Sequence, residues 1–325
     1  MRGWEVWIRG GSYYISETIE LNENDSGESD KPIVYTAYPG EDAEIVGGEV
    51  ITGWELDSGS IYKVYLDDVD NAGWTFEQLF ENGERALSAR IPNTGYFYVA
   101  SVTDLDEYKQ FKYTSGDIPT WTDYDDAQVC FRPGAEYLQN IVDVNNINFV
   151  SRVITLEENS SHPIIDNLSE KWADFSDTRG NYYFIQNVKD ELDTAGEFYL
   201  DTSTGYLYYQ PKSTPIADQT IIAPRVTNLF EFKGANQDTH VQYIELRDLA
   251  LRCAKFTDQF LNEQGSEWNG KTNRPSIEHR KGIIRMENAS YNTIRDCKIS
   301  NGGYQGVAMA SGGECFSLRS LLIGV

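Results

Sequence analysis

The chain has 325 residues, of which 40% are hydrophobic and 13% aromatic, so it can bury a sizeable core and is not a disordered chain. Lysine and arginine number 27 against 51 aspartate and glutamate residues, which gives a formal net charge of −24. Because so acidic a surface repels a phosphate backbone and no basic cluster offsets it locally, the sequence predicts no nucleic-acid partner.

The N-terminal residues show no secretory signal. Met1 to Ile8 alternates polar and apolar residues as a strand does, without a long apolar core or a small-residue cleavage site. Either the protein is cytoplasmic or its true start lies upstream. The longest apolar runs are far shorter than the roughly 18 to 20 residues that span a bilayer, so we expect no membrane-spanning segment.

Residues 1–95 have the pattern of consecutive short strands separated by turns. Such strands recur every eight to twelve residues without intervening helices, which excludes a doubly wound α/β fold and leaves a sandwich, a barrel or a β-solenoid. The expected strands lie at Trp4–Ile8, Tyr13–Leu21, Ile33–Tyr38, Ala43–Val46, Val50–Trp54 and Ile61–Leu66.

Residues 96–225 differ in composition from the flanking regions, because they are rich in tyrosine, tryptophan and acidic residues. We interpret them as an inserted β-rich domain. Asp126–Phe131 and Ile147–Leu156 have the composition of strands. Lys189–Pro211 predicts a hairpin whose turn, Asp201–Gly205, places glycine where a positive φ is needed. Asp166–Ala173 is the best candidate for a short helix.

Residues 226–325 contain an internal repeat, because Leu246–Leu251 returns 48 residues later as Ile294–Ile299 with its Arg-Asp pair. In each copy the apolar positions keep a period of two but change parity across Arg-Asp, a pattern typical of two short strands joined by a bend. Asp248 and Asp296 would occupy equivalent bends.

A second periodic element consists of short apolar segments that begin at Leu229, Ile283 and Val307, the last two 24 residues apart. That spacing fits one coil of a parallel β-solenoid. The sequence therefore predicts an all-β protein, a right-handed parallel β-helix (solenoid) interrupted by the β-rich insertion. After Ser311 no third Arg-Asp copy follows, so we expect the register to fail there and the chain to be cut short.

Asp248 and Asp296 are the candidate catalytic residues. Stacked coils would set their carboxylates one strand spacing apart, about 4.8 Å at the backbone, and retaining glycosidases hold two acids roughly 5 Å apart. The competing interpretation is a solvated bend in which Arg247 and Arg295 neutralise the acids locally. We favour the second interpretation.

No metal site or cofactor is predicted. Asn22–Gly27 imitates the first half of a calcium loop, but the twelfth position is Ile33 where a bidentate glutamate is needed, so a turn is expected. His162, His240 and His279 are scattered.

Glycine and cysteine residues also have structural interpretations. Gly302–Gly306 lacks phosphate-loop spacing and is expected to turn tightly between strands. No C-x-x-C spacing occurs, and the repeat places Cys297 where the other copy has Leu249, which indicates a buried thiol.

Three groups of ordered segments carry a resemblance: Trp7–Tyr14, Asp25–Gly27, Tyr35–Glu41 and Gly47–Trp54; Leu79–Arg85 and Ala89–Pro92; Glu191–Asp201 and Gly205–Pro211. In that order they resemble the N-terminal region, the segment before the insertion domain and the end of that domain in bacterial right-handed parallel β-helix proteins of glycoside hydrolase family 141 and its relatives.

The resemblance implies extracellular or periplasmic action on oligo- or polysaccharides of plants or hosts, with α-L-fucosidase and xylanase activities in the family. The expected reaction is hydrolysis of a glycosidic bond by paired carboxylates without a cofactor. The family's catalytic acids lie in later coils and match no position here, so this chain is expected to be catalytically incomplete.

Two alternatives stay open. One is a non-catalytic carbohydrate-binding or structural β-helix segment. The other is a polysaccharide lyase, which the absence of a calcium loop and of a basic cluster for uronates disfavours.

Overall fold

A computed structural model describes residues 3–133, 139–160, 163–165, 181–256, 281–309, 317–319 and 322–323. The described chain is all-β: its single α-helix, α1 (Asp67–Ala72), has six residues. The predicted helix at Asp166–Ala173 lies outside the described residues.

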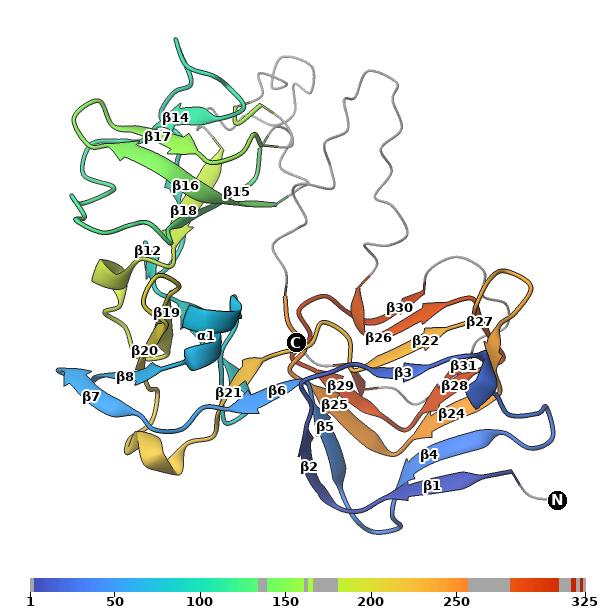
Figure 1. The fold of residues 1–325 in the computed structure, drawn as a ribbon. Coiled ribbons are helices and arrows are strands. Elements are labelled where there is room, and N and C mark those ends of the chain that lie inside the picture. The colour runs from blue at the N-terminus through green and yellow to red at the C-terminus, as the bar shows by residue number, and fades with distance from the viewer. Residues whose placement is uncertain are drawn as a thin grey trace.

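Three parallel sheets, here called A, B and C, form one half of the structure (Figure 1). In stacking order sheet A contains β1 (Glu5–Ile8), β4 (Ile33–Ala37), β24 (Ile244–Arg247), β28 (Thr293–Arg295) and β31 (Ser317–Arg319). Sheet B contains β2 (Gly11–Tyr14), β5 (Ala43–Val46), β25 (Leu249–Arg252), β29 (Lys298–Ser300) and β32 (Leu322–Ile323). Sheet C contains β3 (Ile19–Leu21), β22 (Phe230–Lys233), β26 (Gly282–Glu287) and β30 (Gln305–Met309).

The chain visits the three sheets in turn, so that one strand from each makes a coil and each new coil pairs with the preceding one. A short fourth pair, β23 (Val241–Gln242) with β27 (Ala289–Ser290), adds to the same stacking. We call this part the three-sheet body.

Side chains of equivalent strand positions stack to form the interior of the body. In sheet B, Ile45 pairs with Leu251 and Leu251 with Ile299, and each is at most 4% exposed. The strands are only two to six residues long, so each coil buries few side chains, and burial of each contributes about 1.5 to 3 kcal/mol. Stability therefore accumulates by stacking coils, as in repeat proteins generally.

The corners between sheets use residues in the left-handed region of backbone space. Asp248 and Asp296 have φ of 56° and 54° and join sheets A and B, which confirms the predicted bend and explains the change of parity. Aspartate and asparagine tolerate this conformation better than most residues. Tyr243 and Tyr291, at the preceding corner, also have positive φ, and their rings stack at 5.3 Å.

The predicted failure of the register after Ser311 is wrong. β31 pairs with β28, setting Leu318 beside Ile294, and β32 pairs with β29, setting Ile323 beside Ile299. The offset is 24 residues, and Ser320 stands where the other copies have aspartate. The ladder needs the apolar alternation, which this segment keeps, and does not need the Arg-Asp pair that marked the repeat.

Residues 48–224 form separate, mainly antiparallel sheets between β5 and β22. A four-stranded sheet contains β10 (Glu84–Arg85), β9 (Phe80–Glu81), β21 (Ile221–Pro224) and β6 (Gly48–Val50). A five-stranded sheet contains β11 (Leu87–Ser88), β19 (Glu197–Asp201), β20 (Tyr206–Gln210), β8 (Ile61–Tyr65) and β7 (Glu55–Ser58). A seven-stranded sheet contains β12 (Arg90–Ile91), β18 (Tyr182–Gln186), β15 (Gln128–Phe131), β16 (Asn140–Asn148), β17 (Val153–Leu156), β14 (Gln110–Lys112) and β13 (Phe97–Tyr98). The division at residues 95 and 225 stays a prediction.

The hairpin predicted at Lys189–Pro211 is present as β19 and β20. Its turn is fixed by Asp201, whose Oδ1 accepts the N–H groups of Ser203 and Thr204. The single strand expected at Ile147–Leu156 is wrong, because β16 ends at Asn148 and β17 begins at Val153. Asn148 closes a turn there by accepting the N–H groups of residues 150 and 151.

The 48–224 region packs on the outer face of sheet B at one end of its strands. Val46 and Cys253 of the body form a buried cluster with Phe80 and Ile222 of the region. The Asn301 side chain donates a hydrogen bond to the Gly83 carbonyl at 2.6 Å.

Replacing Asn292 should destabilise the stack of coils. This side chain is 1% exposed, accepts the Ile244 N–H at 3.0 Å and donates to the Val241 carbonyl at 3.0 Å. Asn292→Ala leaves two buried backbone groups without partners, so we expect the free energy of unfolding to fall by about 2 to 4 kcal/mol. Urea unfolding followed by circular dichroism measures this, with Thr293→Ala on the outer face as the control. Equal unfolding midpoints for the two variants would contradict this role.

Candidate functional site

An open groove of about 910 Å³ runs along the outer corner between sheets A and B. Its origin is a difference in corner length between coils. Asp248 alone separates β24 from β25, and Asp296 and Cys297 separate β28 from β29, whereas five residues, 38–42, separate Ala37 from Ala43 in the coil of β4. The longer corner projects and forms one wall of the groove.

The floor and the second side of the groove come from the bends and from sheet B. Asp248 and Asp296 both line it. Ser12, Glu44 and Lys298 reach it from three different strands of sheet B, whose register places them in one row. Strands far apart in the sequence thus supply a continuous polar surface.

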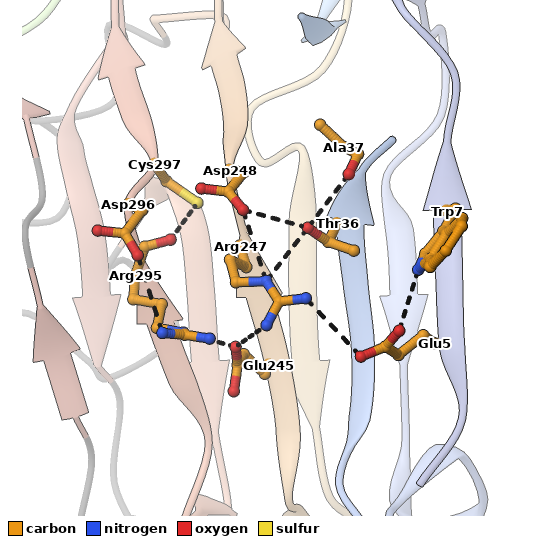
Figure 2. Close-up of polar contacts among 10 residues, drawn as sticks. All are labelled: Glu5, Trp7, Thr36, Ala37, Glu245, Arg247, Asp248, Arg295, Asp296 and Cys297. Atoms are coloured by element: carbon orange, nitrogen blue, oxygen red, sulfur yellow. Dashed lines mark hydrogen bonds and ion pairs between the residues drawn. The ribbon is translucent and has the colours of Figure 1, made fainter. Parts of the chain in front are cut away.

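The two candidate carboxylates occupy equivalent bends on adjacent coils and both are accessible. The side chains of Asp248 and Asp296 are 54% and 44% exposed. Asp248 Oδ2 lies 3.5 Å from Arg247 Nε and accepts a hydrogen bond from the Thr36 hydroxyl at 3.4 Å (Figure 2). Asp296 Oδ2 lies 3.9 Å from Arg295 Nη1. Each acid therefore has the neighbouring arginine that the sequence predicts.

Glu245, which sequence reasoning did not single out, is an ion-pair partner of both arginines (Figure 2). Its Oε1 accepts a hydrogen bond from Arg295 Nε at 2.6 Å and lies 3.5 Å from Arg247 Nη1. The hydrogen bond from Arg295 to Glu245 raises the pKa of Arg295. The signal was available in the sequence, because Glu245 precedes Arg247 by two positions and so lies on the same face of its strand.

These surroundings suit binding better than proton transfer. A carboxyl group that acts as general acid near neutral pH is held protonated by an apolar pocket. Asp248 and Asp296 instead lie half-exposed beside guanidinium groups. The arrangement offers fixed donors and acceptors to hydroxyl groups of a ligand in the groove.

The projecting corner is braced by Arg9 and Glu41. Arg9 forms a fork with the Glu41 carboxylate, at 2.6 Å and 2.9 Å, and the Gly10 N–H donates to the same carboxylate at 2.6 Å. The Arg9 hydrogen bond and that backbone N–H lower the pKa of Glu41 to about 2. The Arg9 guanidinium also lies over the Tyr38 ring, 4.8 Å from its centroid, and Trp7 packs edge-on against Tyr38 at 5.2 Å.

Two buried acids outside the groove have raised pKa values. Burial raises the pKa of Glu197, which is 1% exposed, from 4.5 to about 7, although backbone N–H groups of Thr194 and Asp193 donate to it. Burial also raises the pKa of Glu191, whose carboxylate accepts the Trp121 indole N–H at 2.6 Å. Both lie in the 48–224 region and hold loops, so we assign them structural roles.

The remaining candidates from the sequence occupy structural positions. Asn22 caps the 3₁₀ turn Glu23–Asp25 with a reciprocal hydrogen bond from its N–H to Asp25, so the calcium-loop imitation is a turn as predicted. His240 contacts the Ser290 hydroxyl and the Gln237 carbonyl, while His162 and His279 lie outside the described residues.

Cys297 is a buried free thiol, as predicted, and burial raises its pKa to about 11. Across the described ranges no group of three or more His, Cys, Asp or Glu side chains is arranged to hold a metal ion. Within the same residues no helix has the length and apolar character needed to cross a membrane.

Comparisons with known proteins give a structural relationship. No protein-family model matches the chain, and no curated protein matches it. A solved structure described as "Glycoside hydrolase" superposes with a TM-score of 0.67 at 17% identity, covering 92% of this chain and 57% of its own. Another, "The complex structure of XylC with xylose", gives a TM-score of 0.38 at 11% identity, covering 99% of this chain and 49% of its own. The chain shares the fold of the first and spans about half the length of both.

The raised pKa of Glu197 should make stability depend on pH. Between about pH 4.5 and 7 the folded chain keeps a proton that the unfolded chain has released, so the free energy of unfolding falls as pH rises through this window and levels above it. In Glu197→Gln the free energy of unfolding should decrease by about 2 to 3 kcal/mol less across this window than in wild type.

Denaturant unfolding at several pH values measures the difference between wild type and Glu197→Gln. Glu55→Gln, an exposed change on β7 of the same sheet, is the matched control and should leave the pH profile as in wild type. A Glu197→Gln profile parallel to that of wild type would show that Glu197 does not titrate in this window.

Proposed function

We propose that the chain is part of a carbohydrate-active protein, a right-handed parallel β-helix of glycoside hydrolase type, whose groove between sheets A and B binds glycans. The superposition on a glycoside hydrolase over 92% of the chain carries this proposal. The stacking of coils through sheets A, B and C supports the β-helix. Right-handed connection is proposed because parallel strands of one sheet are joined right-handedly in nearly all proteins.

The groove supports a glycan as the ligand by its mixture of groups. Its lining combines a tyrosine ring, a serine hydroxyl, carboxylates and a lysine, supplied by the projecting corner, the bends and sheet B. Sugars present hydroxyl groups that exchange hydrogen bonds with such side chains and C–H faces that pack on aromatic rings. Together with the resemblance to glycoside hydrolase family 141, this favours a substrate of the fucoside or xylan type.

We further propose that this chain by itself is catalytically incomplete. The half-exposed aspartates beside arginines make a binding surface, and the paired acids for hydrolysis would then lie on other coils of the complete protein. A non-catalytic carbohydrate-binding or structural segment is the second candidate. It is favoured by the same observation, the ion pairs of Asp248 and Asp296 at a bend that requires positive φ.

Assays of the purified chain test this proposal. We expect binding of xylo-oligosaccharides or fucosylated oligosaccharides, measured by calorimetry, without turnover of aryl fucosides, aryl xylosides or xylan. Asp248→Asn and Asp296→Asn should change that binding by no more than a few fold. Neither variant should differ from wild type in the amount of product formed from these substrates.

Turnover that Asp296→Asn abolishes would contradict the assignment of this residue to a structural bend and would make the pair catalytic. A chain that neither binds nor cleaves any of these sugars would leave only the structural alternative.

A further inference from the structure

We propose that Trp7 and Tyr38 form a stacking subsite for a neutral sugar ring at the end of the groove nearest β1. The inference rests on the proposed function, because it names where and how the glycan is held. It assigns a role to two aromatic side chains that the bend at Asp248 and Asp296 does not involve.

Both rings are accessible although they belong to the body. Trp7 is 49% exposed and Tyr38 is 38% exposed. Trp7 points outward from sheet A in register with Thr36 and Arg247, whereas Tyr38 begins the projecting corner. Their centroids lie 5.2 Å apart with planes at 81°, so the rings form an angled surface and not a closed stack.

The rings are held in place before any ligand binds. The Trp7 indole N–H donates to Glu5 at 3.1 Å, and Arg9 lies on Tyr38 while its fork to Glu41 fixes the guanidinium. The Tyr13 hydroxyl donates to the Arg9 carbonyl at 2.9 Å. Because aromatic side chains fixed in this way lose little conformational freedom on binding, they favour affinity.

The subsite adjoins the groove through Tyr38, against which Trp7 packs. Tyr38 contributes to its lining together with Ser12, Asp42 and Asp248. Figure 2 shows Trp7 and Asp248 on the same outer face, with the strand of Thr36 between them. Neighbouring strands are about 4.8 Å apart, so a ligand lying across the coils can pack one ring on the aromatic pair and place hydroxyl groups over the bend.

The charges around the groove favour a neutral sugar. Five carboxylates (Glu41, Asp42, Glu44, Asp248 and Asp296) and one lysine, Lys298, are among the residues that line it. Arg9 is bound to Glu41, and Arg252 to Glu44 at 2.5 Å and 2.7 Å. A uronate would place its own carboxylate among these acids, whereas hydroxyl groups can donate to them.

Calorimetric titration with xylohexaose, cellohexaose and an oligogalacturonate tests the subsite. Trp7→Ala and Tyr38→Ala should each weaken binding of the preferred neutral hexaose about tenfold, the factor that corresponds to about 1.4 kcal/mol. Trp7→Phe keeps a ring and should stay within about threefold of wild type. Trp4→Ala is the matched control, since Trp4 precedes the same strand and is 79% exposed, whereas Trp7 packs edge-on against the groove residue Tyr38.

The outcomes separate the two proposals. Wild-type binding that Trp7→Ala and Tyr38→Ala leave unchanged overturns the subsite and leaves the proposed function intact. Tighter binding of the oligogalacturonate than of the neutral sugars overturns the choice of a neutral ring. A wild-type chain that binds none of the three sugars and no fucosylated oligosaccharide contradicts the proposed function itself. A ligand-induced change in tryptophan fluorescence that is retained in Trp4→Phe and lost in Trp7→Phe supports the subsite independently of any loss of stability.

Discussion

The parallel hydrogen-bonded ladder between successive coils is the constraint on which the three-sheet body depends. A strand of two to six residues cannot bury enough surface to be stable by itself, so each must lie in register on the strand of the preceding coil. Register fixes which side chains face inward, as the Ile45, Leu251 and Ile299 stack illustrates. It also fixes which face outward, and that outer surface is where ligands can reach the body.

Corner chemistry follows from the same constraint. Where a coil turns in one residue, the backbone takes a positive φ and aspartate is well suited to it, so aspartates stack for conformational reasons. Where a coil uses a longer corner, as at residues 38–42, the chain projects and a groove results. The acids of this site are thus explained first by backbone geometry, and any role in binding is added to that structural role.

Residues 48–224 show how a large β-rich segment can be accommodated in such a body. Parallel pairing between coils stops after β5 and resumes at β22. The strand β22 pairs with β3, and β25 pairs with β5, so the coils before and after the segment pair directly with each other. The segment packs on one end of sheet B through a cluster of Val46, Phe80, Ile222 and Cys253. The corner between sheets A and B is left accessible, and its projecting wall comes from the body itself.

By itself the sequence determined the all-β class, the hairpin of β19 and β20, and the bends at Asp248 and Asp296, because these depend on local periodicity and turn residues. The apolar pattern of the last coil, with Leu318 and Ile323, is also present in the sequence. It was missed because serine replaces the aspartate of the repeat, and the strand pairing with Ile294 and Ile299 identifies it. Only the tertiary structure decided how the strands outside the repeat stack, that Glu245 is shared by two arginines, and that Trp7 packs against the groove residue Tyr38. The reason is physical: these contacts join residues on different coils, and the register that brings them together is set by the whole stack and not by any one segment.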